Sequence, residues 1–272
     1  MYDFFTQSPF STNMPTSIWI EPISGACGAL CATLILHPLD TLKVQLQGNN
    51  LNLKQTIAGV HKGNHWYAGV GANIMGNVVA WSSYFLLYSE FKQQIDSPFV
   101  AASAAGACTL LFTNPLFVAK TRMITEPRYY SSFVNCIASI VKKEGPLGLY
   151  AGFGMGLIGT LHGGVQFFAY ERIKTFFNLD SSNFSTISYL LASGSSKVIA
   201  TCATYPYQVI RTRLQQRNND KTAIGITKNV YTEYGLLGFY RGLVPGLVRV
   251  LPASMITLTC YEATKRFLID FK

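Results

Sequence analysis

Three short motifs in this sequence place a base five residues after a proline, a pattern that suits contacts between helices. In the first motif, "HPLDTLK", Pro38 is followed by Asp40 and Lys43. A proline inside a helix removes a backbone hydrogen bond and bends the helix. Residues three apart lie on the same helix face. The motif therefore predicts a bent helix that presents an acid and a base together to its neighbours.

The same motif recurs in "TNPLFVAKTRM" (113–123) and "TYPYQVIRTRL" (204–214). A Tyr-containing motif recurs in "LYSEFK", "AYERIK" and "CYEATK", and an aromatic-x-Gly motif in "YAG", "YAG" and "YRG". The order of the motifs is the same each time, which is typical of tandem repeats of about ninety residues. We predict a tail over 1–15 and three repeats over 16–96, 97–178 and 183–272.

The composition favours a membrane protein, because 49% of the residues are hydrophobic, only 13% are charged and the mean hydropathy is +0.23. Each repeat has room for two spans of about 20 residues, and only helices satisfy the backbone of such runs in lipid. We expect an all-α membrane protein of six transmembrane helices in three two-helix repeats with pseudo-threefold symmetry. The expected helices cover 16–45, 68–93, 97–123, 151–177, 185–214 and 242–268.

Charge distinguishes the two ends of the expected bundle. The segments that link the two helices of each repeat (40–70, 115–150 and 206–241) hold fourteen Lys and Arg residues and five acids, whereas the rest of the chain holds eight of each. We call this the basic end. The positive-inside rule predicts that it faces the inner compartment, and it suits anionic lipid headgroups.

The positions of the motifs indicate two gates around a central path. Acids of the proline motifs can pair with bases of neighbouring helices and close the basic end, while the Tyr-containing motifs close the other end. Such a layout is typical of an alternating-access transporter. In the alternative interpretation the same pairs only hold a static bundle together, but a threefold recurrence at both ends argues against it.

From 16 to 269 the chain resembles the mitochondrial carrier family, in its proline motifs, its aromatic-Gly motifs and its Tyr-acid motifs. The resemblance implies short matrix helices, a monomer in the inner mitochondrial membrane with both termini toward the intermembrane space, and a small anionic substrate. It implies cardiolipin on the matrix side, and neither nucleic acid nor a cofactor. It places the matrix gate at Asp40, Lys43, Gln45, Lys120 and Arg211. It places the cytosolic gate at Tyr88, Lys92, Tyr170, Glu171, Lys174, Tyr261, Glu262 and Lys265.

This chain departs from the family pattern at three positions. Phe117 and Gln208 replace acids of the second and third proline motifs, and Ser89 replaces the first cytosolic acid. We therefore expect one full ion pair in the matrix gate, between Asp40 and Lys120. The family branch that carries FAD, folate, NAD and pyrimidine nucleotides also lacks the second acid, and 71–88, 156–171 and 246–262 resemble its FAD and folate members.

Charge inside the expected membrane region points to the substrate. Ionisable residues at that depth are expensive and usually mark a transport path, which singles out Lys197 and Arg249 as buried cations for an anion such as a pyrophosphate. The family's contact points fall on Gly76, on Gly159 with Thr160, and on Arg249. Trp81 offers a face to a flat ring. Among the histidines, we expect His162 to face the cavity.

These features predict a carrier of FAD. A folate carrier is the first alternative, an NAD or pyrimidine-nucleotide carrier the next, and a proton or anion leak pathway an alternative of another class. The sequence shows no nucleophile with its base and no metal-ligand spacing, so an enzyme is not expected. Gly154, Gly156 and Gly159 match the dinucleotide fingerprint G-x-G-x-x-G, but they lack its strand context and are interpreted as helix-packing residues.

Overall fold

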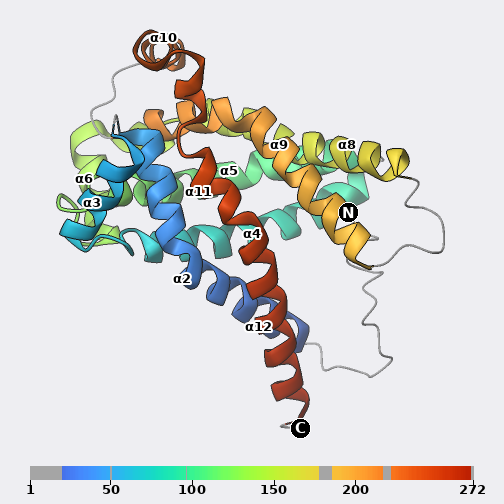
Figure 1. The fold of residues 1–272 in the computed structure, drawn as a ribbon. Helices are drawn as coiled ribbons and strands as arrows, with labels where there is room; N and C mark the ends of the chain where they lie inside the picture. Colours follow the sequence, from blue (N-terminus) through green and yellow to red (C-terminus); the bar gives the residue numbers. More distant parts are fainter. Residues whose placement is uncertain (1–19, 50, 96, 178–185, 217–221, 271–272) are drawn as a thin grey trace. The chain divides into compact units, whose positions relative to one another are not determined.

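The computed structural model describes residues 20–49, 51–95, 97–177, 186–216 and 222–270, and every regular element in them is a helix (Figure 1). The prediction of an all-α protein is confirmed. The elements in chain order are α2 Ile20–Gly48, α3 Leu53–Gly63, α4 Val70–Gln94, α5 Pro98–Thr125, α6 Phe133–Glu144, η1 Pro146–Tyr150, α7 Phe153–Gly159, α8 Leu161–Phe176, α9 Thr186–Leu214, α10 Ala223–Tyr234, η2 Gly235–Tyr240, α11 Leu243–Val248 and α12 Val250–Asp270.

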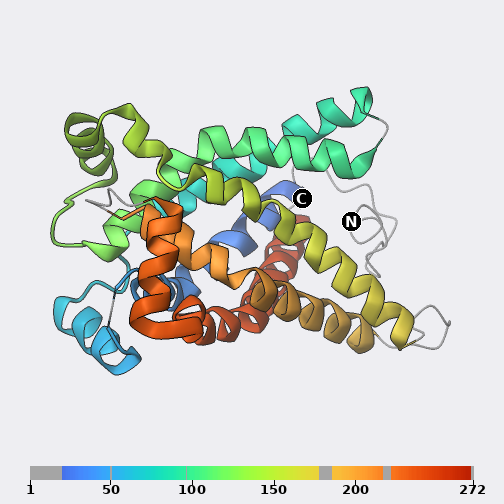
Figure 2. The same ribbon diagram turned by 90° about the horizontal axis from the view of Figure 1, so that it is seen from above.

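The chain forms two compact units. One contains α2 up to Leu34 together with α12 from Pro252, and the other contains Ile35–Leu251. In the first unit α2 and α12 approach closely at Gly28, where an added Cβ would lie 2.5 Å from the carbonyl oxygen of Thr257. In the second unit α4 packs along α5 and α8 along α9 (Figures 1 and 2). This second unit holds the proline motifs.

Within the described residues, Ile23–Gly48 and Val100–Thr125 are long and apolar enough to cross a membrane. Helices α4, α9 and α12 have 25, 29 and 21 residues. At 1.5 Å per residue each is at least about 30 Å long, but their Ser, Thr, Asn and Gly residues lower their hydropathy. The helices predicted over 151–177 and 242–268 are each interrupted at one residue, Thr160 between α7 and α8 and Arg249 between α11 and α12, and both residues keep right-handed helical backbone angles.

The three prolines of the repeated motifs lie inside the first long helix of each repeat: Pro38 in α2, Pro115 in α5 and Pro206 in α9. We call α2, α5 and α9 the odd helices, and the second long segment of each repeat (α4, α7 with α8, and α11 with α12) the even helices. After each odd helix the chain forms a short helix at the basic end. Buried side chains hold these short helices in place: Cys136 and Ile140 of α6 pack on Val118, and Val230 of α10 packs on Ile210. The short helices thus anchor the ends of α5 and α9.

The glycine of each aromatic-x-Gly motif caps the next helix. Gly69, Gly152 and Gly242 have φ values of +73°, +71° and +81°, in the left-handed region that favours glycine. An added Cβ would lie 3.1, 3.2 and 2.9 Å from the carbonyl oxygens of Lys120, Arg211 and Lys43, respectively. Each glycine therefore lets the start of one helix lie directly against the gate base of a neighbouring odd helix.

Candidate functional site

The carboxylate of Asp40 is the centre of a charged cluster between α2, α4, α5 and the end of α11. It is buried, with 5% of the residue exposed. Its Oδ1 lies 3.0 Å from Arg249 Nη1, and its Oδ2 lies 4.0 Å from Lys120 Nζ. The expected pair with Lys120 is thus present at long range. The shorter contact is to Arg249, which the sequence analysis assigned to the substrate.

Asn73 of α4 bridges the long pair, and sequence reasoning missed it. Lys120 Nζ donates to Asn73 Oδ1 at 2.8 Å, and Asn73 Nδ2 donates to Asp40 Oδ2 at 3.5 Å. Only 2% of Asn73 is exposed. A polar residue four positions after Gly69, at the start of an apolar helix, was the available signal. His37, fully buried beside it, contacts the Ala68 carbonyl through Nε2 at 2.9 Å.

The interface between α9 and α2 uses a neutral contact at the same register. Lys43 Nζ donates to Gln208 Oε1 at 3.1 Å, and the same ammonium lies 5.6 Å from the centroid of the Tyr205 ring. Gln208 stands at the position of an acid in the first motif. A carboxamide there still accepts a hydrogen bond from the base, but it cannot neutralise the charge.

The interface between α5 and α9 has no such acceptor at this position, which Phe117 occupies. The Phe117 ring faces Gly76, where an added Cβ would lie 3.1 Å from Cε1 of the ring. The corresponding base, Arg211, has buried Nε and Nη2 atoms without a hydrogen-bond partner among the described residues. A buried guanidinium that lacks these partners carries a large desolvation cost. An anion would compensate it.

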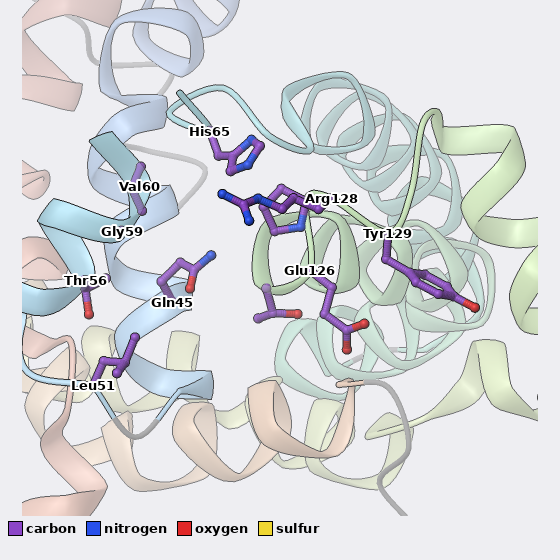
Figure 3. Close-up of a pocket in the computed structure, with 11 residues that line it drawn as sticks. Gln45, Leu51, Thr56, Gly59, Val60, His65, Glu126, Arg128 and Tyr129 are labelled. Atoms are coloured by element: carbon purple, nitrogen blue, oxygen red, sulfur yellow. The ribbon is translucent and has the colours of Figure 1, made fainter. Parts of the chain in front are cut away.

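Gln45 was expected to brace the matrix gate, and its two hydrogen bonds lead to other partners. Its Nε2 donates to the backbone oxygen of Ile124, and its Oε1 accepts from Asn49 Nδ2 at 2.5 Å. Both ends of the amide are therefore engaged away from Asp40. Gln45 also lines a cavity of about 420 Å³ with His65 and Arg128 (Figure 3).

The residues expected to contact substrate lie on α4, α7, α8 and α9 and at Thr160 and Arg249. His162 Nδ1 of α8 lies 2.8 Å from Thr204 Oγ1 of α9. At Gly159 an added Cβ would lie 3.1 Å from the Tyr207 ring, so this position borders α9. Trp81 is 61% exposed and stacks on Phe85 at 5.7 Å.

Lys197 was expected to be buried, and the structure shows an exposed side chain. Its charge acts on Arg249 and on His162, so these three side chains are electrostatic neighbours.

The two helix breaks coincide with expected contact points. Thr160 follows Gly152 by eight residues and Arg249 follows Gly242 by seven, so the two interruptions differ by one position between the repeats. The signal in the sequence was Gly159 before the first break and Pro252 shortly after the second, since a proline cannot donate to the preceding turn.

The residues expected at the opposite end lie on three helices. Lys92 and Tyr88 are on α4, and Tyr88 stacks on Tyr84 at 5.9 Å. Tyr170, Glu171 and Lys174 are on α8. Tyr261, Glu262 and Lys265 are on α12, in the unit formed with α2, and the Lys265 ammonium lies 5.6 Å from the Tyr261 ring. A gate formed by these three groups together stays a prediction.

Comparison with known proteins shows which family this chain resembles. The family model "Mitochondrial carrier protein" matches residues 15–97, 94–181 and 182–272. Nicotinamide adenine dinucleotide transporter 2, mitochondrial, of Arabidopsis thaliana is 34% identical over 281 residues, covering 88% of this chain and 77% of the relative. Folate transporter 1, chloroplastic, of the same plant is 31% identical over 294 residues, covering 92% and 96%.

The mitochondrial FAD carrier protein of Saccharomyces cerevisiae is 27% identical over 305 residues, covering 92% of this chain and 97% of the relative. Members of the matched family are solute transporters and not enzymes. With three matched repeats and helices throughout the described residues, this chain belongs to the mitochondrial carrier family.

Proposed function

We propose that this protein carries FAD or a closely related dinucleotide across the mitochondrial inner membrane by alternating access, with its basic end in the matrix. The observation that carries the substrate class is a charge imbalance. Lys43, Lys120 and Arg249 act on one another electrostatically, and Asp40 is the one carboxylate that acts on Lys43 and Lys120 among the described residues. Arg211 and Lys197 extend the same field.

An excess of cations in a path of low dielectric constant favours a substrate with several negative charges. A pyrophosphate linkage has two, and its oxygens match the planar fork of an arginine. The exposed Trp81 and Phe85 rings offer a surface for a flat ring system. A dinucleotide combines both features.

NAD is the second candidate, because the transporter of Arabidopsis thaliana named for it is more similar (34%) than the yeast carrier named for FAD (27%). A folate, with its glutamate carboxylates, also satisfies the charge requirement. The lack of two gate acids at Phe117 and Gln208 keeps a leak pathway as the alternative of another class. Cardiolipin at the basic end and a monomeric state belong to the same proposal.

The test is uptake of labelled FAD, NAD, folate and UTP into liposomes that contain the purified protein. We expect saturable uptake or exchange of FAD or NAD. If neither enters or exchanges, the dinucleotide proposal is wrong. A rise in membrane conductance without solute selectivity would instead favour the leak pathway.

Variants of the two cations connect uptake to the site. Lys197→Ala removes one cation of this field and should lower uptake roughly tenfold or more, because the substrate anion then loses a compensating charge. Arg249→Ala should do the same, while Arg249→Lys should keep part of the activity because it keeps the charge. Lys142→Ala, an exposed base of α6, is the matched control. Equal thermal midpoints must accompany these results, and wild-type uptake in both alanine variants would remove the two residues from the site.

A further inference from the structure

The ends of the three odd helices are joined by a ring of hydrogen bonds that lies beyond the gate residues. In each repeat the residue two positions after the gate base donates to a backbone oxygen of another odd helix. The acceptor is the residue four positions after that helix's own gate base. The three bonds are Gln45 Nε2 to Ile124 O, Arg122 Nε to Gln215 O at 3.0 Å, and Arg213 Nε to Gln47 O at 3.0 Å.

The ring closes on itself, because it runs from α2 to α5, from α5 to α9 and from α9 back to α2. Its members are buried: Arg122 is 1% exposed, Gln47 is 2% and Gln215 is 4%. Buried hydrogen bonds to charged donors are stronger than neutral ones, and leaving such a donor without an acceptor is costly. These bonds therefore resist separation of the three helix ends.

A second set of bonds reinforces two of the three interfaces. Thr121 Oγ1 donates to Gln215 Oε1 at 2.8 Å, and Thr212 Oγ1 donates to Gln47 Oε1 at 2.9 Å. The first repeat has Val44 and the second has Ile124 at the corresponding positions, so the α2–α5 interface lacks this bond. The ring is thus strong at two interfaces and weaker at the third.

The strong and weak interfaces are the reverse of those in the gate. The α2–α5 interface has the Asp40–Lys120 pair, and its ring donor is the neutral Gln45. The other two interfaces lack a gate acid, because Phe117 and Gln208 stand there, and their ring donors are the charged Arg122 and Arg213. The two interfaces without a gate acid thus have a charged hydrogen-bond donor, Arg122 or Arg213, about one helical turn beyond the gate position.

We propose that this carbonyl ring is a second lock, which holds the basic end closed and compensates for the two missing gate acids. The proposal rests on transport by alternating access, since opening toward the basic end must separate these helices. Its members act as positioning residues. They do not contact the transported solute.

Hydrogen–deuterium exchange of the substrate-free protein in lipid nanodiscs tests the lock without any transport measurement. Arg213→Gln copies the donor that the first repeat already has. We expect roughly tenfold faster exchange in the peptides that end α9 and α2, because a charge-assisted buried bond becomes a neutral one. The peptides that end α5 and the peptides of α4 should change little. Lys228→Gln, an exposed base of α10, is the matched control.

Thr212→Val is the second variant, since it removes only the bond to Gln47 and nearly preserves shape. It should accelerate exchange at the same two helix ends by a smaller factor. If Arg213→Gln fails to fold, the exchange rates of Thr212→Val alone test the proposal. Wild-type exchange at those ends, or an equal increase throughout the chain, would overturn the proposal. A protein that passes this test but transports no dinucleotide would contradict only the proposed substrate.

Discussion

The α2–α5 and α9–α2 interfaces are built at the same register of the repeats but with different chemistry. At α2–α5 a carboxylate, Asp40, lies 4.0 Å from Lys120, and Asn73 bridges the two side chains. At α9–α2 the amide of Gln208 accepts directly from Lys43 at 3.1 Å. The contact to the neutral Gln208 is the shorter of the two, so this position of the repeat keeps its geometry without the acidic charge.

The even helices contribute to this difference. Asn73 follows Gly69 by four residues, and the corresponding positions after Gly152 and Gly242 are Gly156 and Gly246. An added Cβ at Gly156 would lie 3.3 Å from Arg211 Cζ, and one at Gly246 would lie 3.5 Å from Lys43 Cδ. Glycine leaves space for the base, whereas asparagine binds it. One interface is therefore held by three polar side chains, and the others by fewer.

The largest effect should come from Asp40→Asn. This substitution leaves Arg249, 3.0 Å away, and Lys120 without their carboxylate in a buried site. Breaking a buried ion pair by removing one partner typically costs about 3–5 kcal/mol. We expect a large fall in the thermal midpoint of the purified protein. A midpoint within error of wild type would show that the α2–α5 interface does not depend on this charge.

Phe117→Asp should have the next largest effect, in the opposite direction. By register, position 117 faces Arg211 as Asp40 faces Lys120, and Arg211 has buried nitrogen atoms that find no partner in the described part of the chain. A carboxylate there should stabilise the closed basic end by about 1.5–3 kcal/mol, the range for hydrogen bonds to charged groups. The measurement is the labelling rate of a cavity cysteine from the basic side, which should fall.

Phe117→Asn, which has the shape without the charge, is the control for that experiment. If the aspartate and asparagine variants label at the wild-type rate, Arg211 is not accessible to position 117 and the three interfaces do not share one register.

Much of the architecture could be predicted from the sequence, because the repeated motifs are local and their order is fixed. The helical class and the approach of Asp40 to Lys120 follow from proline positions and three-residue spacing. The closer partner, Arg249, could not be predicted as such. Arg249 lies on the last long segment of the chain, outside the proline motifs, and no spacing in the sequence relates it to Asp40.

The carbonyl ring was beyond sequence reasoning for another reason. Its donors Arg122 and Arg213 are visible as bases, but its acceptors are backbone oxygens, which every residue has. The exposure of Lys197 was missed because hydropathy places a residue along a helix and does not show which side borders water. The partners of Gln45 could not be predicted either, because its Nε2 donates to a backbone carbonyl, that of Ile124, while its Oε1 accepts from Asn49.

Asn73→Ala tests the bridge at α2–α5. Lys120 would lose its 2.8 Å acceptor, and a buried unsatisfied donor costs about 1–3 kcal/mol. We expect a moderate fall in the thermal midpoint. Asn77→Ala is the matched control, one turn along the same helix with a 3.4 Å bond to Asn73. An equal fall in both variants would mean that helix α4, and not the bridge, is responsible.

The smallest effect should come from Gln208→Glu, which turns the α9–α2 contact into the kind found at α2–α5. The carboxylate keeps the 3.1 Å acceptor position for Lys43 and adds a charge. Charge-assisted bonds are roughly twice as strong as neutral ones, so we expect a gain of about 1 kcal/mol in the closed state. Uptake should slow as the thermal midpoint rises. The gain must disappear in Gln208→Glu combined with Lys43→Gln, because the new charge then has no ammonium beside it. A rise in the thermal midpoint that persists in the double variant would assign the effect to another cation of the cluster. The α9–α2 contact would then not be equivalent to the α2–α5 ion pair.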